Sequence, residues 1–460
     1  CSSDLNLQPI LEAQKNIATA NQSLQQQVRK YQQLPKAHIG MVKNAYATGN
    51  TQLTKMADKV NQLSGTFQIL PDFLGSDQPR TYALMAMTTS EERSSGGLIG
   101  SVGVVTTDNG KISIGDFRSN GEYIPYGAGD PTEDEQRIFR QWGPLNMSFD
   151  VRDLAVYPDT SRSAEGMRAI WQRTPWGSNT QLDGVLMVDP VFLQELTKIS
   201  GNVTIPDGTV LTGDNTAEFL LNKVYVDYPV SMQDALFAQV AEQTVGSMFS
   251  NVDLTKLTKV AQLMGSMAEG RHFSMYAFDE TAEKTISDAG FTAQTPSSEE
   301  HPQVGVYVTE QNPSKMGWYI HRTSKVTRST CGNDGSQTYH VEYKMTNTLE
   351  NSQIGALTSY ILGSGGQGVE KTLIYAPAGG SISNLKTSGG SVTESRQETL
   401  NGKTVYASNA TIAPGESVTY SFDVTTSTKA VSDLTIDQTP MGWIDSGVTT
   451  DTAACSINKQ

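Results

Sequence analysis

Apolar residues in the first 70 positions recur at helical spacing in two blocks. The first block has four such residues at intervals of seven: Ile10, Ile17, Leu24 and Tyr31. The second block, after Pro35, alternates spacings of four and three residues between positions 42 and 67. This spacing is typical of two helices that pack along one apolar seam. We therefore expect residues 1–70 to form a helical hairpin that serves as a spacer and ends at Pro71.

From residue 71 to about 325, short apolar runs alternate with amphipathic stretches. The runs expected to be strands are 82–87, 98–106, 111–117 and 185–188, and the expected helices are 161–173, 190–199, 216–224, 232–248 and 254–267. Asn109-Gly110 is a type I′ turn signal between two of the strands. Pro190 suits the first turn of a helix, and Gly201 suits its end. This alternation predicts an α/β layered core.

After residue 325 the apolar residues follow period two. They stand at Tyr339, Val341, Tyr343 and Met345, and again at Val418, Tyr420, Phe422 and Val424. Glycine- and serine-rich turns separate these runs at 363–368 and 379–383. This pattern predicts an antiparallel β-sandwich of immunoglobulin-like size. The predicted organisation is a helical hairpin (1–70), an α/β domain (71–325) and a β-sandwich domain (326–460).

Composition narrows the possible partners. The chain has 460 residues, of which 34 are Lys or Arg and 48 are Asp or Glu, so its formal net charge is −14. No basic run stands out, which argues against a nucleic-acid partner. No apolar run approaches the roughly 20 residues that are needed to cross a bilayer. Any anionic ligand would have to be held by a few local cations.

Three cysteines bear on the compartment. Cys331 and Cys455 lie in β-like sequence that is rich in Thr, Ser and Gly, which is typical of exported proteins. We expect them to form a disulfide, with free buried thiols as the alternative. Cys1 is either a lipidated first residue or the point where the chain begins after a removed membrane anchor. Both interpretations favour an extracellular, envelope-anchored protein.

The strongest candidate for chemistry is the segment 92–103, which contains Arg93, Gly96 and Gly97 and is followed by Arg118. Glycine inside a strand lowers stability, so repeated glycine suggests that another group approaches the backbone closely. Two arginines beside such a surface suit an anionic, phosphate-bearing ligand. The structural alternative is a bulged strand whose arginines form ion pairs.

Other residues provide weaker signals. Asn120 and Arg152 supply further donors for such a ligand. The five histidines have no metal spacing, so no metal site is expected: His38, His272, His301, His321 and His340. Carboxylates such as Asp116 and Asp227 are plentiful, and sequence alone does not pair them. Apolar residues of the helices after 216 either line a tunnel or form ordinary core.

Four motifs resemble a large uncharacterised family of Gram-positive cell-envelope proteins. In order along the chain these are 91–101 (EERSSGGLIGS), 157–159 (YPD), 182–190 (LDGVLMVDP) and 270–273 (GRHF). The core is also similar, more distantly, to the LytR–CpsA–Psr domain, in which an arginine begins a hairpin and a second arginine follows it. This resemblance implies a layered α/β/α core.

LytR–CpsA–Psr proteins transfer glycopolymers from a polyprenyl-pyrophosphate carrier to peptidoglycan, with a lipid tunnel, arginines on the pyrophosphate and a nearby magnesium ion. By resemblance, Arg93 and Arg118 correspond to these arginines, and Gln233 belongs to the later ligand-binding segment. The position of the family's metal-binding aspartate is Ser95 here, and Asp234 stands where further cations are expected.

Three functions remain open at this stage. The first is binding of a lipid-linked glycan or cell-wall polymer in an apolar pocket flanked by arginines, without efficient turnover. A second is an active glycopolymer phosphotransferase in which Asp116 or Asp227 is the acid, with magnesium required only in this case. The third is a surface adhesin with a purely structural core.

Overall fold

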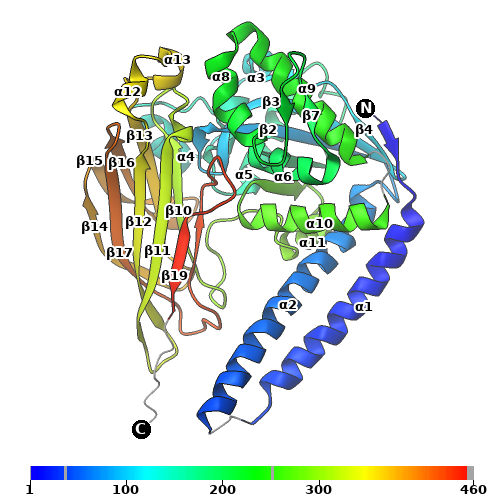
Figure 1. Cartoon of the computed structure of the whole chain (residues 1–460), viewed down its shortest axis with the longest axis vertical. Helices are drawn as coiled ribbons and strands as arrows, with labels where there is room; N and C mark the ends of the chain where they lie inside the picture. Colours follow the sequence, from blue (N-terminus) through cyan, green and yellow to red (C-terminus); the bar gives the residue numbers. More distant parts are fainter. Residues whose placement is uncertain (1, 36–38, 250–252, 453–460) are drawn as a thin grey trace.

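A seven-stranded mixed sheet forms the centre of the first part of the computed structural model, which describes residues 2–35, 39–249 and 253–452 (Figure 1). Its order is β1-β4-β3-β2-β6-β9, with β5 paired to β3. The strands are β1 (Ser2–Asp4), β2 (Arg80–Arg93), β3 (Gly96–Asp108), β4 (Lys111–Ile114), β5 (Arg118–Ser119), β6 (Gly184–Val188) and β9 (Phe273–Ala277). β2 pairs in parallel with β6, and the other pairs are antiparallel. The predicted turn is present, because Asn109 and Gly110 both have positive φ.

Helices cover both faces of this sheet. Because side chains alternate along a strand, Tyr82 and Leu84 of β2 lie on one face and Ala83 and Met85 on the other. The first face packs against α6 (Pro190–Ser200), α9 (Val230–Phe249) and α10 (Leu254–Glu269). The second face packs against η3 (Val151–Val156) and α5 (Thr160–Arg173). The predicted mixed α/β architecture is therefore confirmed.

Two long helices lie between β1 and β2 along the chain and project from the sheet as a hairpin (Figure 1). They are α1 (Leu7–Gln32) and α2 (Gly40–Phe73). The end of α2 contacts α10 and α11 (Glu280–Asp288), and Phe67 there is fully buried. Farther out, Met56 is exposed although the sequence places it on the seam. α2 also continues through Pro71 instead of ending at it.

The second half contains two five-stranded sheets. One has the order β15-β16-β13-β10-β18, and the other β14-β17-β12-β11-β19. The strands are β10 (Gln303–Glu310), β11 (Ile320–Cys331), β12 (Gln337–Asn347), β13 (Gly368–Tyr375), β14 (Ser381–Ser388), β15 (Ser391–Leu400), β16 (Lys403–Ile412), β17 (Ser417–Thr425), β18 (Thr435–Gln438) and β19 (Val448–Asp451). Val306 of β10, Tyr343 of β12 and Phe422 of β17 share one hydrophobic cluster.

Both of these sheets are mixed, which corrects the purely antiparallel prediction. β18 pairs in parallel with β10, and β19 pairs in parallel with β11. Period-two alternation shows that a strand is half buried but gives no information about its direction. The strands begin at Gln303, and the predicted boundary at 325/326 falls inside β11. Cys331 at the end of β11 is disulfide-bonded, and its predicted partner Cys455 lies outside the described residues.

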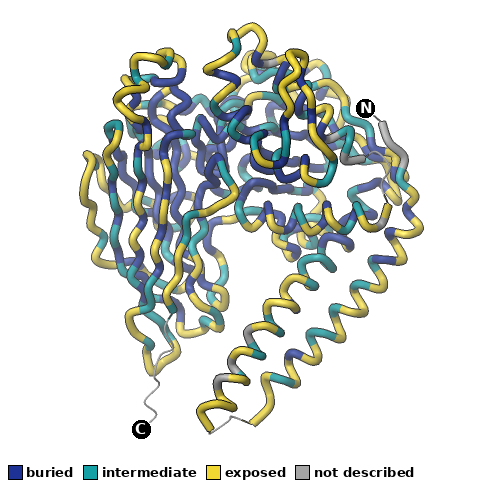
Figure 2. Tube along the Cα trace, viewed as in Figure 1, coloured by how far each residue is buried: buried dark blue, intermediate teal, exposed yellow. Residues whose placement is uncertain are grey.

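The sheet that contains β10 lies between the other sheet and the α/β part. One face of β10, with Val306 and Val308, joins the cluster between the two sheets. The other face carries Tyr307, which joins Phe139 and Val151 in the cluster of the α/β part. Figure 2 shows this continuity as buried segments that extend from the strands into the helical layer. The two halves therefore share a core.

Short elements connect these parts. They are α3 (Asn120–Tyr123), η1 (Ile124–Tyr126), α4 (Glu133–Glu135), η2 (Gln136–Gln141), β7 (Val203–Thr204), β8 (Val210–Leu211), α7 (Thr216–Glu218), η4 (Phe219–Lys223), α8 (Val224–Asp227), η5 (Met316–Trp318), α12 (Asn351–Ile354) and α13 (Ser359–Leu362).

Candidate functional site

Arg93, the first predicted ligand-binding arginine, is buried in an ion pair. Its side chain is 5% exposed, and its Nε and Nη2 lie 3.0 and 2.8 Å from Oδ1 of Asp153. Its Nη1 donates to the carbonyl of Glu92, and Ser148 donates twice to the other oxygen of Asp153. Burial favours the neutral carboxyl, but Arg93 and Ser148 hold the pKa of Asp153 below its usual value. An anionic ligand would have to displace Asp153 to reach Arg93.

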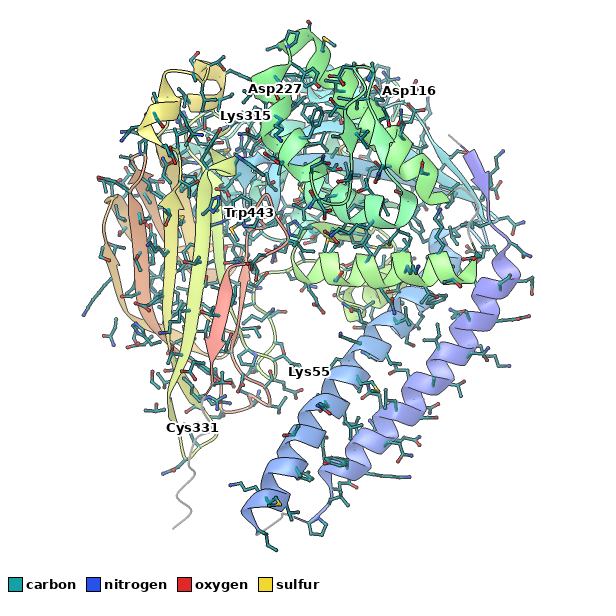
Figure 3. All side chains as sticks on the ribbon, in the orientation of Figure 1. Lys55, Asp116, Asp227, Lys315, Cys331 and Trp443 are labelled. Atoms are coloured by element: carbon teal, nitrogen blue, oxygen red, sulfur yellow. The ribbon has the colours of Figure 1, made fainter. Side chains whose placement is uncertain are left out.

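The two glutamates before Arg93 are paired as well. Glu91 forms an ion pair with Lys315, which precedes η5 and is labelled in Figure 3. Glu92 lies 3.0 Å from Nη2 of Arg322 on β11, and both side chains are buried. Three consecutive charged residues of β2 therefore contact three separate segments. Two of those segments belong to the second half of the chain.

A group of buried carboxyls surrounds this point. Glu310 and Glu370 stand directly opposite each other on β10 and β13, and both are buried. Among the described residues, neither carboxyl oxygen of Glu370 has a hydrogen-bond partner. Burial, with added repulsion from neighbouring carboxylates, raises the pKa of Glu310 and Glu370 well above the usual value. Burial also raises the pKa of Glu92 to about 7, against the opposing effect of Arg322.

The predicted glycine surface is filled by the protein itself. A Cβ on Gly97 would lie 1.8 Å from the carbonyl oxygen of Thr88, and one on Gly96 would lie 3.0 Å from Met87. The hairpin is bulged here, because the register shifts between Thr88 and Glu92. The close approach that glycine permits is to the neighbouring strand, and not to a ligand.

Arg118 lies at a different place on the same sheet. It is half exposed, forms a 3.0 Å ion pair with Glu122 and stacks over Trp176 at 4.4 Å. Asn120 donates 3.0 Å to the carbonyl of Ile99. These contacts attach α3 to β3. The donor groups of Arg118 and Asn120 are thus used within the protein and do not point together toward one ligand.

The two arginines do not converge, which corrects the central geometric prediction. Arg93 pairs with Gly96 of β3, whereas Arg118 pairs with Val102 of that strand. At about 3.3 Å per residue, these pairing positions are roughly 20 Å apart. Sequence order placed the arginines at the two ends of a strand–turn–strand unit, but the length of β3 separates them.

The remaining predicted residues are also scattered. Arg152 binds Asp150 through two nitrogens, at 2.9 and 2.6 Å. Gln233 is buried and donates to the carbonyl of Tyr228. Asp116, in the loop between β4 and β5, and Asp227, on α8, are both exposed, and Figure 3 shows them apart. These two carboxylates therefore do not form the catalytic pair that was considered.

The apolar residues of the later helices form core. Leu220, Val224 and Val240 are buried in the cluster that packs under β2 and β6. Across the described ranges, no group of three or more His, Cys, Asp or Glu is arranged to hold a metal ion. In the same ranges, no helix is long and apolar enough to span a membrane.

A second buried network joins the other three sequence motifs. Arg271 has φ +60° and donates to both carboxyl oxygens of Asp437 on β18, at 2.6 and 2.5 Å. It also donates to the carbonyl of Pro158. His272 lies 2.6 Å from the carboxylate of Asp189, which caps α6. These motifs fasten the sheet, α5 and β18 to one another.

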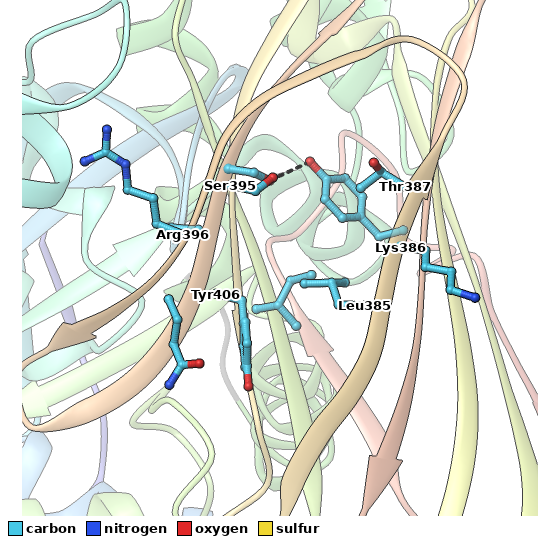
Figure 4. Close-up of a pocket in the computed structure, with 11 residues that line it drawn as sticks. Leu385, Lys386, Thr387, Ser395, Arg396 and Tyr406 are labelled. Carbon is cyan, nitrogen blue, oxygen red and sulfur yellow. Dashed lines mark hydrogen bonds between the residues drawn. The ribbon is translucent and has the colours of Figure 1, made fainter.

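A cleft of about 400 Å³ opens where the edges of the two five-stranded sheets diverge (Figure 4). It is lined by the rings of Tyr406 and Tyr420, by Leu385, and by the polar side chains of Thr387, Ser395 and Gln397. Figure 4 shows Lys386 and Arg396 pointing away from this space. Arg396 instead stacks over Trp142 at 4.7 Å.

Sequence reasoning missed the cleft. The inward positions of β14 and β15 carry Thr387, Ser395 and Gln397, where a closed sandwich has apolar residues. These polar residues at inward positions are the signal in the sequence that could have indicated a cleft. An ordinary edge strand shows the same pattern, so the signal does not distinguish the two. Tyr420 is held by a 2.9 Å hydrogen bond between its hydroxyl and that of Ser408, so the floor of the cleft is positioned in advance.

The fold and this geometry define a mixed α/β protein with two attached sheets and an open cleft at their edge. Residues 77–225 match the model of a family described as "Protein of unknown function (DUF4012)". The predicted resemblance to an uncharacterised family is confirmed for that segment. No curated protein matches the chain.

Two solved structures have weak similarity. One is a putative nutrient binding protein (lpg2210) from Legionella pneumophila subsp. pneumophila str. Philadelphia 1, at 10% identity and a TM-score of 0.17, with 28% of this chain and 44% of that chain covered. The other is protein gbs0355 from Streptococcus agalactiae, at 13% identity and a TM-score of 0.25, with 46% and 74% covered. The chain thus spans less than half of the first. At these scores the likeness carries no structural argument.

Gly97→Ala tests the structural role of the glycine motif. The new methyl group would overlap the carbonyl of Thr88, so the free energy of unfolding should fall by about 3 kcal/mol. Chemical denaturation measures this loss. Gly100→Ala is the matched control, because its Cβ would meet only the carbonyl of Ala86, at 3.9 Å. Equal effects of the two substitutions would contradict the packing argument.

Glu370→Gln tests the buried carboxyls. The folded-state pKa of Glu370 is raised above 4.5, so the stability that its proton confers is present at low pH and is lost as pH rises. Glutamine cannot ionise, so the variant should gain free energy of unfolding relative to the wild type as pH rises above the unfolded-state pKa, by at most about 1.4 kcal/mol for each pH unit, until the folded-state pKa is passed. Denaturation at pH 5, 6 and 7 measures this difference. Glu342→Gln, which changes an exposed glutamate of β12, is the matched control, and a constant difference for Glu370→Gln would refute the account.

Proposed function

We propose that this chain is an exported, non-catalytic glycan-binding protein whose site is the cleft between the sheet edges. The observation that carries this proposal is the lining of the cleft. Tyr406, which is half-buried, offers a ring face that suits the apolar face of a sugar ring, while Thr387, Ser395 and Gln397 offer hydroxyl and amide groups for sugar hydroxyls. Such a mixture suits a polar, uncharged ligand with apolar faces.

The chemistry of the cleft favours binding over turnover. None of the described residues that line it is Asp, Glu or His, the usual acids and bases of glycan hydrolysis and transfer. The carboxylates considered for catalysis, Asp116 and Asp227, belong to other surfaces. We therefore favour a receptor or scaffold for a cell-wall polymer over a transferase.

The paired arginines bear on which part of a lipid-linked glycan would be bound. Pyrophosphate carries at least two negative charges and needs guanidinium groups whose donors are available. Arg93 is occupied by Asp153, and Arg118 is paired with Glu122. The proposal thus concerns the sugar part of such a ligand. We further propose that the α/β core has a LytR–CpsA–Psr-like layering and supports the cleft.

Two features support a location in the cell envelope. Cys331 is disulfide-bonded, and structural disulfides persist mainly in oxidising compartments outside the cytosol. The hairpin of α1 and α2 projects from the body of the protein, as a spacer between an anchor and a binding surface would (Figure 1).

Ser395→Trp provides the direct test. Ser395 is exposed on β15, so an indole there would fill the cleft without entering the core. Titration calorimetry with N-acetylglucosamine oligomers, soluble peptidoglycan fragments and neutral hexose oligosaccharides should detect binding by the wild type. The substitution should weaken it at least about tenfold, which is 1.4 kcal/mol.

Tyr406→Ala should weaken the same binding, because it removes a ring from the wall of the cleft. Tyr360→Ala is the matched control, since Tyr360 is an exposed tyrosine on α13 and does not line the cleft. Binding of none of these probes, or binding that Ser395→Trp leaves unchanged, would overturn the proposal.

A further inference from the structure

Lys371 of β13 is buried in an apolar setting. It is fully buried, and its Nζ lies 5.3 Å from the ring centre of Trp142 and 5.9 Å from that of Phe139. Its hydrogen bonds go to the carbonyls of Ile138 and Trp142. Within the described part of the chain, no carboxylate forms an ion pair with it. Burial lowers the pKa of Lys371 to about 7, so much of the amine is neutral at neutral pH.

Space for this amine is built into the neighbouring loop. Gly143 has φ +111°, and a Cβ there would lie 3.0 Å from Nζ of Lys371. A neutral amine that donates to two carbonyls keeps its lone pair available. It is therefore a nucleophile in a dry environment.

Asn409 of β16 stands directly opposite Lys371 in the antiparallel register. Cβ atoms of such pairs are about 5 Å apart, which a lysine side chain spans easily. The side-chain amide of Asn409 is buried and only half satisfied. Its Nδ2 donates 2.7 Å to Oε2 of Glu394, while its Oδ1 has no partner among the described residues.

Glu394 reaches Asn409 because β15 is bulged. The register of β15 with β16 shifts between Thr393 and Arg396, and Glu394 has φ +55°. This conformation is uncommon for a residue with a long side chain, and bulges often redirect a side chain toward a site. The three residues thus present an amine, an amide and a carboxyl on one face of adjacent strands.

We propose that Lys371 and Asn409 form an intramolecular isopeptide bond with Glu394 as the proton-transfer group. The lone pair of Nζ attacks Cγ of Asn409, and a C–N bond forms. Glu394 takes a proton from Nζ and delivers a proton to Nδ2, the Cγ–Nδ2 bond breaks, and ammonia leaves. The reaction needs no oxidant or co-reactant. Nζ keeps one hydrogen. The N–H of the new amide can donate to one of the two carbonyls that Nζ contacts in this structure, those of Ile138 and Trp142.

The bond would fix β13 to β16 covalently. These are the central strands on which β10 and β15 are built, and β16 also contributes Tyr406 to the cleft. A crosslink there would keep the sheet intact under mechanical load or protease attack. It does not depend on the proposed glycan ligand.

Intact-mass spectrometry of the purified full chain is the test. The wild type should have a mass lower than its sequence mass, corrected for the disulfide, by the mass of one ammonia. Lys371→Met and Asn409→Ala should restore the full mass, and Glu394→Gln should slow or abolish the loss. Lys344→Arg, which changes an exposed lysine of β12, is the matched control and should retain it.

Peptide mapping must place the lost ammonia. Asn109-Gly110, Asn120-Gly121 and Asn401-Gly402 can each lose ammonia by forming a succinimide. A succinimide takes up water in mild alkali, whereas the isopeptide persists and joins the peptides of Lys371 and Asn409 in one branched fragment. A wild-type chain with its full sequence mass, or a loss confined to a succinimide, would overturn the proposal.

Discussion

Buried charge at the end of β2 is the constraint on which the rest of the structure depends. Glu91, Glu92 and Arg93 follow one another at the end of β2, which still pairs with β3 there but extends beyond its pairing with β6. An unpaired charge in that position would destabilise the protein by several kcal/mol, so each residue requires a partner. Their partners are Lys315, Arg322 and Asp153 respectively. Two of these partners lie in the second half of the chain. The charged residues at the end of β2 therefore cannot all find partners within the α/β part alone.

The buried network around Arg271 also requires a partner from the second half of the chain. Arg271 follows α10 and finds its carboxylate, Asp437, on β18. Tyr307 of β10 donates to that same carboxylate. The four motifs at 91–101, 157–159, 182–190 and 270–273 therefore lie along a seam between two structural regions. Their residue types are explained by assembly of that seam, and no catalytic role is needed to account for them.

Sequence reasoning succeeded where the signal was local. The turn at Asn109-Gly110, the helix that begins at Pro190 and the long hairpin helices all follow from periodicity and backbone chemistry over a few residues. Helix α2 was predicted less well at its end, because a proline in the last turn of a helix does not always terminate it.

The prediction of the candidate site was wrong because it depended on distances between residues in the folded chain. Arg93 and Arg118 are close in sequence, but the length of β3 separates them, and only the register reveals this. The partners of Glu92 and Arg93 are 230 and 60 residues away, so a spacing rule could not reveal them. The cleft depends on how two sheet edges diverge, and the triad of Lys371, Asn409 and Glu394 depends on register and a bulge. Each of these is a property of strand pairing.

The central claim is that buried ion pairs make the α/β part and the two sheets one cooperative unit. Native-state hydrogen exchange measures this directly, because it gives the opening free energy of each strand. The account predicts that the slowest amides of β2 and β6 and those of β12 and β17 share the same opening free energy, that of global unfolding. Strands β12 and β17 that stay protected at energies where β2 and β6 have already opened would contradict it.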